Sequence, residues 1–260
     1  MKRIGYSLLA VLAFAAPAWA TVSPNGAHIV ERVYNDCPSS ILITTNAYPA
    51  LISFNDTQLS CFGFANRHVW NFSSDGGATE QKFRNRDQFS FSAYVVIDGT
   101  GDGESGLRIS PWWSPYNDGM FNIRVPDGEI AVFSGRLPFY SFTASHGITY
   151  VKGTAIKLSF DYIPNDVSAI DPGTIIYTAQ IGANVYSSGP LAFDHANPAE
   201  DPPYGVWGIL NDARAGGHAQ FRLGNGTPVD VSATWRDIVF EAGPTPAEKS
   251  SWGKIKADYR

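Results

Sequence analysis

The stretch Gln88–Ser110 reads Q-F-S-F-S-A-Y-V-V-I-D-G-T-G-D-G-E-S-G-L-R-I-S, and it decides the fold. Its first half places apolar residues at every second position, which is the period of a β-strand with one buried face. A turn of glycines and acidic residues follows, and Leu107 and Ile109 then resume the alternation. The stretch therefore predicts two strands joined by a tight turn.

The same period of two continues through the chain. Further strands are expected at 120–125, 129–133, 156–162, 174–181, 204–210, 218–223 and 229–240. Turn-forming residues separate them, and the sequence contains 25 glycines and 17 prolines. No helical pattern precedes residue 245. We therefore expect an all-β fold, a two-sheet antiparallel β-sandwich.

Residues 1–20 have the pattern of a secretory signal peptide. Lys2 and Arg3 precede an apolar stretch, and Ala18-Trp19-Ala20 has the small-x-small form of a cleavage site. We expect a secreted protein, located outside the cell, on its surface or in a periplasm. One sandwich domain is expected over 21–243, with no membrane span, because no later stretch approaches the ~20 apolar residues that a span requires.

The net charge limits the classes of possible partner, and the cysteines indicate the redox state of the protein. Removal of residues 1–20 leaves 17 basic side chains against 24 acidic ones, a formal charge of −7. Such a chain repels polyanions, so no nucleic-acid partner is expected. Export to an oxidising compartment favours a disulfide between Cys37 and Cys61, with two buried free thiols as the alternative.

The C-terminal segment 244–260 differs from the rest of the chain. After a proline-containing linker, Trp252, Ile255 and Tyr259 are spaced as on one face of a helix, among basic residues. A short basic amphipathic C-terminal helix is therefore expected. It either packs back on the sandwich or frays, as chain ends do, or it binds a partner.

Three sets of residues show a family resemblance: the strand Glu104–Ile109, the segments 175–178 and 184–187, and the segments 204–209 and 235–240. They resemble, in this order, the E-A-G-L-x-[IV] strand, the mid-domain hairpin and the closing strands of the concanavalin A-like lectin/glucanase superfamily, which includes laminin-G-like modules. The resemblance covers about residues 65 to 241. It implies a jelly roll whose concave sheet often binds glycans, and it carries over no catalytic residues.

The glycine-rich turn permits two ligand hypotheses. Gly101-x-Gly103-x-x-Gly106 matches the dinucleotide fingerprint, but that mechanism requires a helix after the loop, and here a strand follows. We therefore expect no nucleotide site. The carboxylates of Asp98, Asp102 and Glu104 could instead converge on calcium, the only candidate cofactor, with a plain solvated turn as the alternative.

Strand alternation predicts a polar face that could bind a glycan. If Leu107 and Ile109 face the core, Arg108 faces away from it, and the same rule applies to two other strands. Trp112 and Trp113 follow directly; one is expected to be buried and the other to offer a platform for a sugar ring, extended by Tyr204. The complete predicted site is Arg108, Trp112, Trp113, Tyr116, Asn122, Arg124, Trp207, His218, Gln220 and Arg222. The alternative is the ordinary solvent-facing side of an antiparallel sheet.

Two enzyme classes are also relevant to this sequence. The E-x-D-x-E strand of retaining glucanases is absent, although a separated pair such as Glu129 with Asp161 or Asp212 stays open. A polysaccharide lyase needs a histidine or tyrosine base and groups that neutralise a uronate carboxylate. Suitable residue types stand at Arg108, Asn122, Arg124, His146, Tyr162 and His218.

The leading prediction is therefore a protein that binds a polysaccharide or another glycan. A polysaccharide-degrading enzyme is the first alternative, with a lyase ahead of a glycoside hydrolase. A structural or adhesive surface protein without a small ligand is the second alternative.

Overall fold

The computed structural model describes residues 21–193 and 207–243. The predictions of a signal peptide at 1–20, of a basic helix in 244–260 and of a sugar contact at Tyr204 lie outside these ranges. Within them, no helix is long and apolar enough to cross a membrane.

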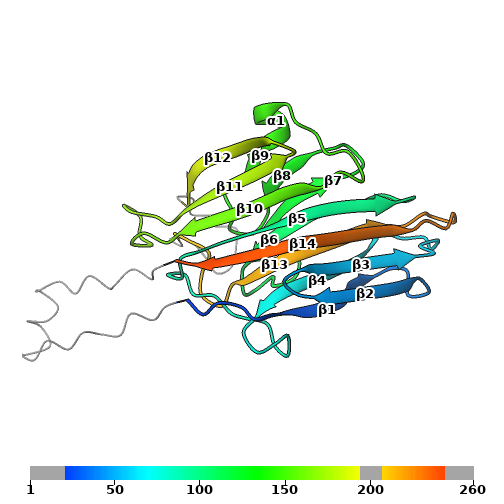
Figure 1. Ribbon diagram of the computed structural model, residues 1–260, viewed down its shortest axis with the longest axis horizontal. Coiled ribbons are helices and arrows are strands. Elements are labelled where there is room, and N and C mark those ends of the chain that lie inside the picture. The colour runs from blue at the N-terminus through cyan, green and yellow to red at the C-terminus, as the bar shows by residue number, and fades with distance from the viewer. Residues whose placement is uncertain (1–20, 194–206, 244–260) are drawn as a thin grey trace, which may run out of the picture. The chain divides into compact units, whose positions relative to one another are not determined.

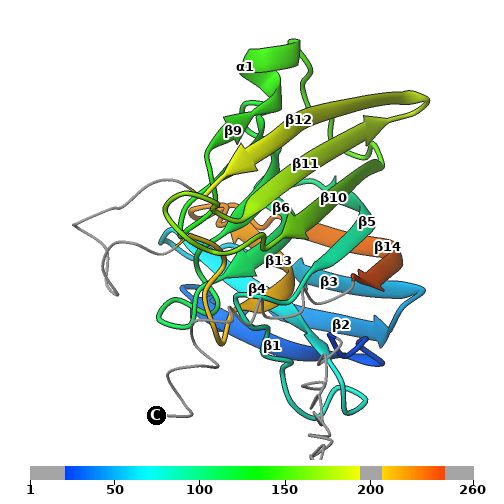
Figure 2. The same cartoon turned by 90° about the vertical axis from the view of Figure 1, so that its left-hand side faces the viewer.

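Two antiparallel sheets of seven strands pack face to face, so the predicted all-β sandwich is confirmed (Figure 1). In spatial order, sheet A contains β1 (Gly26–Asn35), β4 (Ala65–Ser73), β13 (Arg214–Arg222), β6 (Gly103–Ser110), β7 (Met120–Arg124), β8 (Ile130–Phe133) and β9 (Tyr140–Ser141). Sheet B contains β12 (Asn184–Ala192), β11 (Thr174–Ile181), β10 (Ile156–Ile163), β5 (Phe89–Gly99), β14 (Val231–Ala242), β3 (Leu51–Thr57) and β2 (Ile41–Ala47). One end of the sandwich carries β9 and a short helix, and the other carries β1 and β2 (Figure 2).

Two predictions about local structure are wrong, and β1 to β4 lie in a region, 26–73, for which no strand was predicted. Phe142–His146 forms the short helix α1, which Ser141 caps at its start and Gly147 ends in a left-handed conformation. The predicted strand at 204–210 is wrong in its described part, 207–210, which contains no strand. Leu210 and Asp212 have φ values of 70° and 59°, which an extended strand does not permit.

The core between the sheets is aromatic. The indole rings of Trp70 on β4 and Trp235 on β14 meet edge to face, with their centroids 6.1 Å apart. Gly217 on β13 leaves room for both, because a Cβ there would lie 2.3 Å from the Trp70 Nε1 atom. Trp235 Nε1 donates a hydrogen bond to the Gly106 carbonyl oxygen at 3.0 Å, so β14 of sheet B is tied to β6 of sheet A.

The glycine-rich turn that follows β5 is a crossing between the sheets. Gly99 ends a strand of sheet B and Gly103 begins a strand of sheet A. Gly99 has a φ of 113°, and a Cβ there would lie 2.2 Å from the Asp230 carbonyl oxygen, so only glycine fits. The crossing places β6 in sheet A between β13 and β7.

The predicted disulfide between Cys37 and Cys61 is present. It links the segment after β1 to the segment before β4. Next to it, the Asp36 carboxylate accepts a hydrogen bond from the backbone N–H of Phe64 at 2.8 Å. These two links fix the backbone that carries the exposed Phe64 side chain.

Candidate functional site

The register of sheet A brings polar residues of several strands into rows on its outer face, the side turned away from sheet B. One row runs Arg67, Gln220, Glu104, Arg124 across β4, β13, β6 and β7. The next row runs Val69, His218, Gly106, Asn122 across the same strands. The core-facing neighbours Leu107, Phe121 and Phe221 are fully buried between the sheets.

Residues 111–119, the covering loop, connect β6 to β7 and fold over part of this outer face. Arg67 Nε donates to the Tyr116 carbonyl oxygen at 2.9 Å, and the Arg108 guanidinium donates to the Pro115 carbonyl oxygen. Both arginines are buried, and neither forms an ion pair with a carboxylate of the described residues. Burial lowers the pKa of Arg108 to about 9, and Arg67 adds to this effect, so the guanidinium keeps its charge at neutral pH.

A buried polar layer lies in the neighbouring row. His218 and Asn122 flank Gly106, and both side chains are fully buried. Neither the ring nitrogens of His218 nor the amide atoms of Asn122 have a hydrogen-bond partner in the described part of the chain. Burial, together with the charges of Arg67 and Arg108, holds the pKa of His218 well below its usual range, so its imidazole is neutral at pH 7.

The predicted open polar face is therefore closed at Arg108, Asn122 and His218. All three side chains are inaccessible in this structure, so none of them offers a surface to a ligand. Strand alternation correctly assigns the side of the sheet but carries no information about a loop that returns over it.

The two neighbouring tryptophans also differ from the expectation. Pro111 follows the end of β6, and the Ser114 N–H bonds to the Pro111 carbonyl oxygen, so the chain turns here and does not stay extended. Trp112 is 49% exposed and Trp113 is half-buried, with their rings edge to face at 5.8 Å. The prediction that one of them is buried in the sandwich is wrong.

The remaining aromatic residues of the predicted site have separate positions. The Tyr116 ring lies below the Arg108 guanidinium, 6.0 Å from its carbon, within the covering loop. Trp207 lies outside the covering loop. Its carbonyl oxygen accepts a hydrogen bond from the backbone N–H of Gly173, directly before β11.

An open cavity of about 260 Å³ lies farther along the outer face of sheet A. We call it the Phe64 cavity; its lining is Phe64, Gly103, Glu104, Arg124, Pro126, Gln220 and Arg222. Three of these, Arg124, Gln220 and Arg222, belong to the site predicted from the sequence. Phe64 was missed because it precedes β4 in a short segment without a strand pattern, and only its 63% exposure next to the cavity reveals it.

Hydrogen bonds fix the polar wall of the Phe64 cavity. Gln220 Nε2 donates to the Glu104 carboxylate at 3.1 Å, and Arg67 donates to the Gln220 amide oxygen at 3.1 Å. Arg124 lies 3.6 Å from Glu104 and 3.1 Å from Glu129. Burial is the main effect on the Glu104 carboxyl, and it raises the pKa of that group. The planar donor and acceptor groups are therefore held in place before any ligand arrives.

The three carboxylates of the calcium hypothesis have different surroundings. Glu104 faces the Phe64 cavity, Asp102 lies 3.9 Å from the Lys152 amine, and Asp98 accepts a bond from the Gly99 N–H. Among residues 21–193 and 207–243, no group of three or more histidine, cysteine, aspartate or glutamate side chains is arranged around a common metal position. Calcium binding at this turn gains no support from the side-chain positions.

The residues considered for catalysis are only partly brought together. Arg108, Asn122 and His218 are all buried on the outer face of sheet A, with Arg108 one row beyond the other two, and Arg124 lines the Phe64 cavity. His146 is on α1, where its ring bonds to Tyr140, and the Tyr162 hydroxyl donates to the Asn85 carbonyl oxygen in the core. Glu129 and Asp161 are associated with different sheets, so this carboxylate pair does not form one site.

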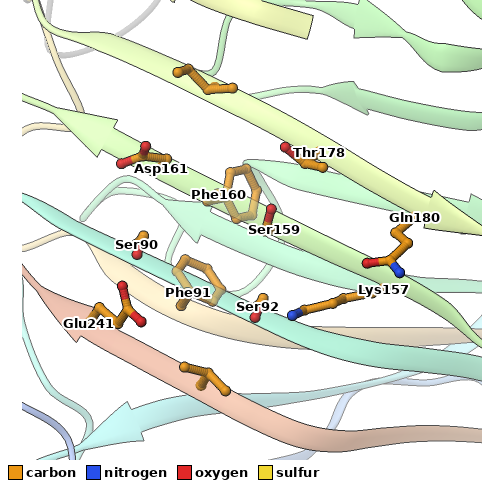
Figure 3. A pocket seen from close by; sticks show the side chains of 12 residues that line it. Ser90, Phe91, Ser92, Lys157, Ser159, Phe160, Asp161, Thr178, Gln180 and Glu241 are labelled. Atoms are coloured by element: carbon orange, nitrogen blue, oxygen red, sulfur yellow. The ribbon is translucent and has the colours of Figure 1, made fainter. Parts of the chain in front are cut away.

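A groove on the outer face of sheet B was not predicted. It has a volume of about 370 Å³ and crosses β14, β5, β10 and β11 (Figure 3). Its polar lining is Ser90, Ser92, Lys157, Ser159, Asp161, Thr178, Gln180 and Glu241. The sequence signal was present, since these residues alternate with core residues, but only strand pairing shows that they lie together.

Comparisons with known proteins give similarity in structure only. The sequence matches no protein-family model and no curated protein. Among solved structures, the family 7 alginate lyase A1-II′ in complex with substrate has a TM-score of 0.44 and 8% identity, covering 75% of this chain and 79% of that one. The alginate lyase from Corynebacterium sp. has a TM-score of 0.41 and 10% identity, covering 84% and 94% of the two chains.

A lectin is similar as well. The seed lectin of Lotus tetragonolobus has a TM-score of 0.39 and 10% identity, covering 84% of this chain and 99% of that one. The likeness in all three cases is one of fold alone.

The neutral buried state of His218 predicts a pH dependence of stability. The pKa of His218 is lowered in the folded protein, so below about pH 6.5 the unfolded chain takes up a proton that the folded chain does not. This residue should therefore destabilise the fold by up to about 1.4 kcal/mol per pH unit as the pH falls from about 6.5 to 5.5. Urea unfolding of the wild type and of His218→Asn at both pH values measures this loss of stability. An identical loss in both proteins would contradict the lowered pKa assigned to His218.

Proposed function

We propose that the protein binds a polysaccharide or another glycan in the Phe64 cavity. The observation that carries the proposal is the lining of this cavity, where an exposed aromatic ring lies next to fixed planar hydrogen-bonding groups. Sugar rings present C–H faces that pack on aromatic rings, and hydroxyl groups that bond to guanidinium, amide and carboxylate groups. Phe64 supplies the first contact, and Arg124, Gln220 and Glu104 supply the second.

The preorganised wall supports binding in preference to a merely solvated surface. Gln220 and Glu104 already bond to each other and to flanking arginines, so little side-chain entropy is lost when a ligand binds. Arg222 is exposed at the rim and remains available to a ligand. Export by a signal peptide at 1–20 would bring this cavity to glycans outside the cell, and a basic tail at 244–260 would serve attachment to a partner.

Binding of the wild type to immobilised glycans, followed by titration with the best ligand, tests this function. Phe64→Ala and Arg222→Ala should each weaken binding about tenfold, because each removes a direct contact worth about 1 kcal/mol or slightly more. Phe62→Ala is the matched control, since Phe62 is 80% exposed but does not line the cavity.

Two outcomes would contradict the proposal. The first is no glycan binding by the wild type. The second is equal binding by the wild type and Phe64→Ala together with loss of binding in Phe62→Ala or Trp112→Ala, which would place the sugar on another surface.

The buried layer favours one other function, a polysaccharide lyase. The ring nitrogens of His218 have no hydrogen-bond partner among the described residues, so its neutral imidazole could accept a proton once exposure to a substrate relieves the burial that lowers its pKa. Arg108 and Asn122 lie on the same face of the neighbouring strands and could neutralise a uronate carboxylate. A substrate could reach these groups only if the covering loop moved away, since all three are buried.

Incubation with uronate polymers tests this second function. Lyase action forms a conjugated double bond, which absorbs at about 235 nm. The wild type should increase this absorbance and His218→Ala should not, whereas His146→Ala, on α1, should retain full activity. A wild type that leaves the absorbance unchanged on alginate, pectate and glucuronate polymers would exclude His218 as a lyase base.

A further inference from the structure

The outer face of sheet B carries a groove on the side of the sandwich opposite the Phe64 cavity. Its floor is made of short hydroxyl side chains on central strands. Ser90 pairs with Asp161 and Ser92 with Ser159 across β5 and β10, and Thr178 follows on β11. Longer side chains on β11 and β14 form the two walls (Figure 3).

A β-bulge in β14 determines which residues form one of these walls. Trp235 faces the core, and strict alternation would send residues 237, 239 and 241 to the core as well. The pairing with β5 shifts between Arg236 and Val239, where Asp237 has a φ of 51°. The extra residue exchanges the two faces, so Val239 and Glu241 turn outward into the groove while Phe240 packs inward.

The bulge thereby sets two carboxylates on either side of Ser90. Glu241 pairs with Ser90 on one side and Asp161 on the other, and Figure 3 shows both carboxylates beside the serine. Neither carboxylate forms an ion pair within the described part of the chain. The only cation in the lining is Lys157, two residues along β10 from Ser159, where it lies over the Tyr94 ring. One end of the groove is therefore acidic.

We infer that this groove binds an oligosaccharide that carries protonated amino groups. The hydroxyls of Ser90, Ser92 and Ser159 can each donate and accept hydrogen bonds, as a chain of sugar hydroxyls requires. The Asp161 and Glu241 carboxylates only accept, and they attract a cationic ammonium group at one end. Ile176 and Val239 give the walls apolar surface for the C–H faces of the rings.

The backbone of the groove excludes one other mode of binding. β5 and β10 are each paired with strands on both sides, so their N–H and C=O groups are already bonded. A peptide therefore cannot bind here by adding a strand, and recognition depends on side chains alone. The two carboxylates also distinguish this groove from the Phe64 cavity, which contains Arg124 and Arg222.

Calorimetric titration of the full chain with a glucosamine tetrasaccharide tests the inference. Binding should be detectable, and Asp161→Asn and Glu241→Gln should each weaken it about tenfold, the value expected for a hydrogen bond to a charged group. Glu31→Gln on β1 is the matched control, because it removes an exposed carboxylate from the other sheet. The uncharged N-acetylglucosamine and glucose tetrasaccharides should bind more weakly.

Variants of the Phe64 cavity separate this inference from the proposed function. Phe64→Ala should leave binding of the glucosamine tetrasaccharide unchanged, whatever it does to the ligand of the Phe64 cavity. No binding of this probe by the wild type would overturn the inference. So would binding that Asp161→Asn and Glu241→Gln do not weaken, or that Phe64→Ala abolishes.

Discussion

The hydrogen bonds from two buried guanidinium groups to the backbone of the covering loop divide the outer face of sheet A into a closed part and an open part. Arg67 and Arg108 are buried without a carboxylate partner among the described residues, and carbonyl oxygens of 111–119 accept a hydrogen bond from each of them. A buried charge is tolerated only when such bonds compensate for lost water. His218 and Asn122 are buried in the row between these two arginines, and beyond the covering loop the Phe64 cavity stays open.

Two local deviations from regular strands determine which side chains each sheet presents on its outer face. The crossing at Gly99 carries the chain from the middle of sheet B to the middle of sheet A, where β6 contributes Glu104 and Arg108. The bulge at Asp237 reverses the alternation of β14 and turns Glu241 outward. The sandwich therefore presents arginines around a cavity on one side and paired carboxylates around a groove on the other.

Much of the fold follows from the period-two pattern, because burial of one strand face is a local property of the sequence. The same pattern assigns Arg124, Gln220 and Arg222 to one side of sheet A, where they line a single cavity. The covering loop was not predictable, since its contacts with Arg67 join residues about fifty positions apart. The groove on sheet B was not predicted for a similar reason, because only strand pairing brings Asp161 and Glu241 next to Ser90. In addition, the bulge turns Glu241 outward, whereas strict alternation from Trp235 predicts that it faces the core.

The most direct test of glycan binding in the Phe64 cavity is a nuclear magnetic resonance titration with the glycan that binds the wild type best. We expect the largest amide shifts at Phe64, Glu104, Gln220 and Arg222, which line the cavity, and small shifts in the covering loop. Shifts confined to residues 111–119, or to the strands of sheet B, would contradict this assignment of the site.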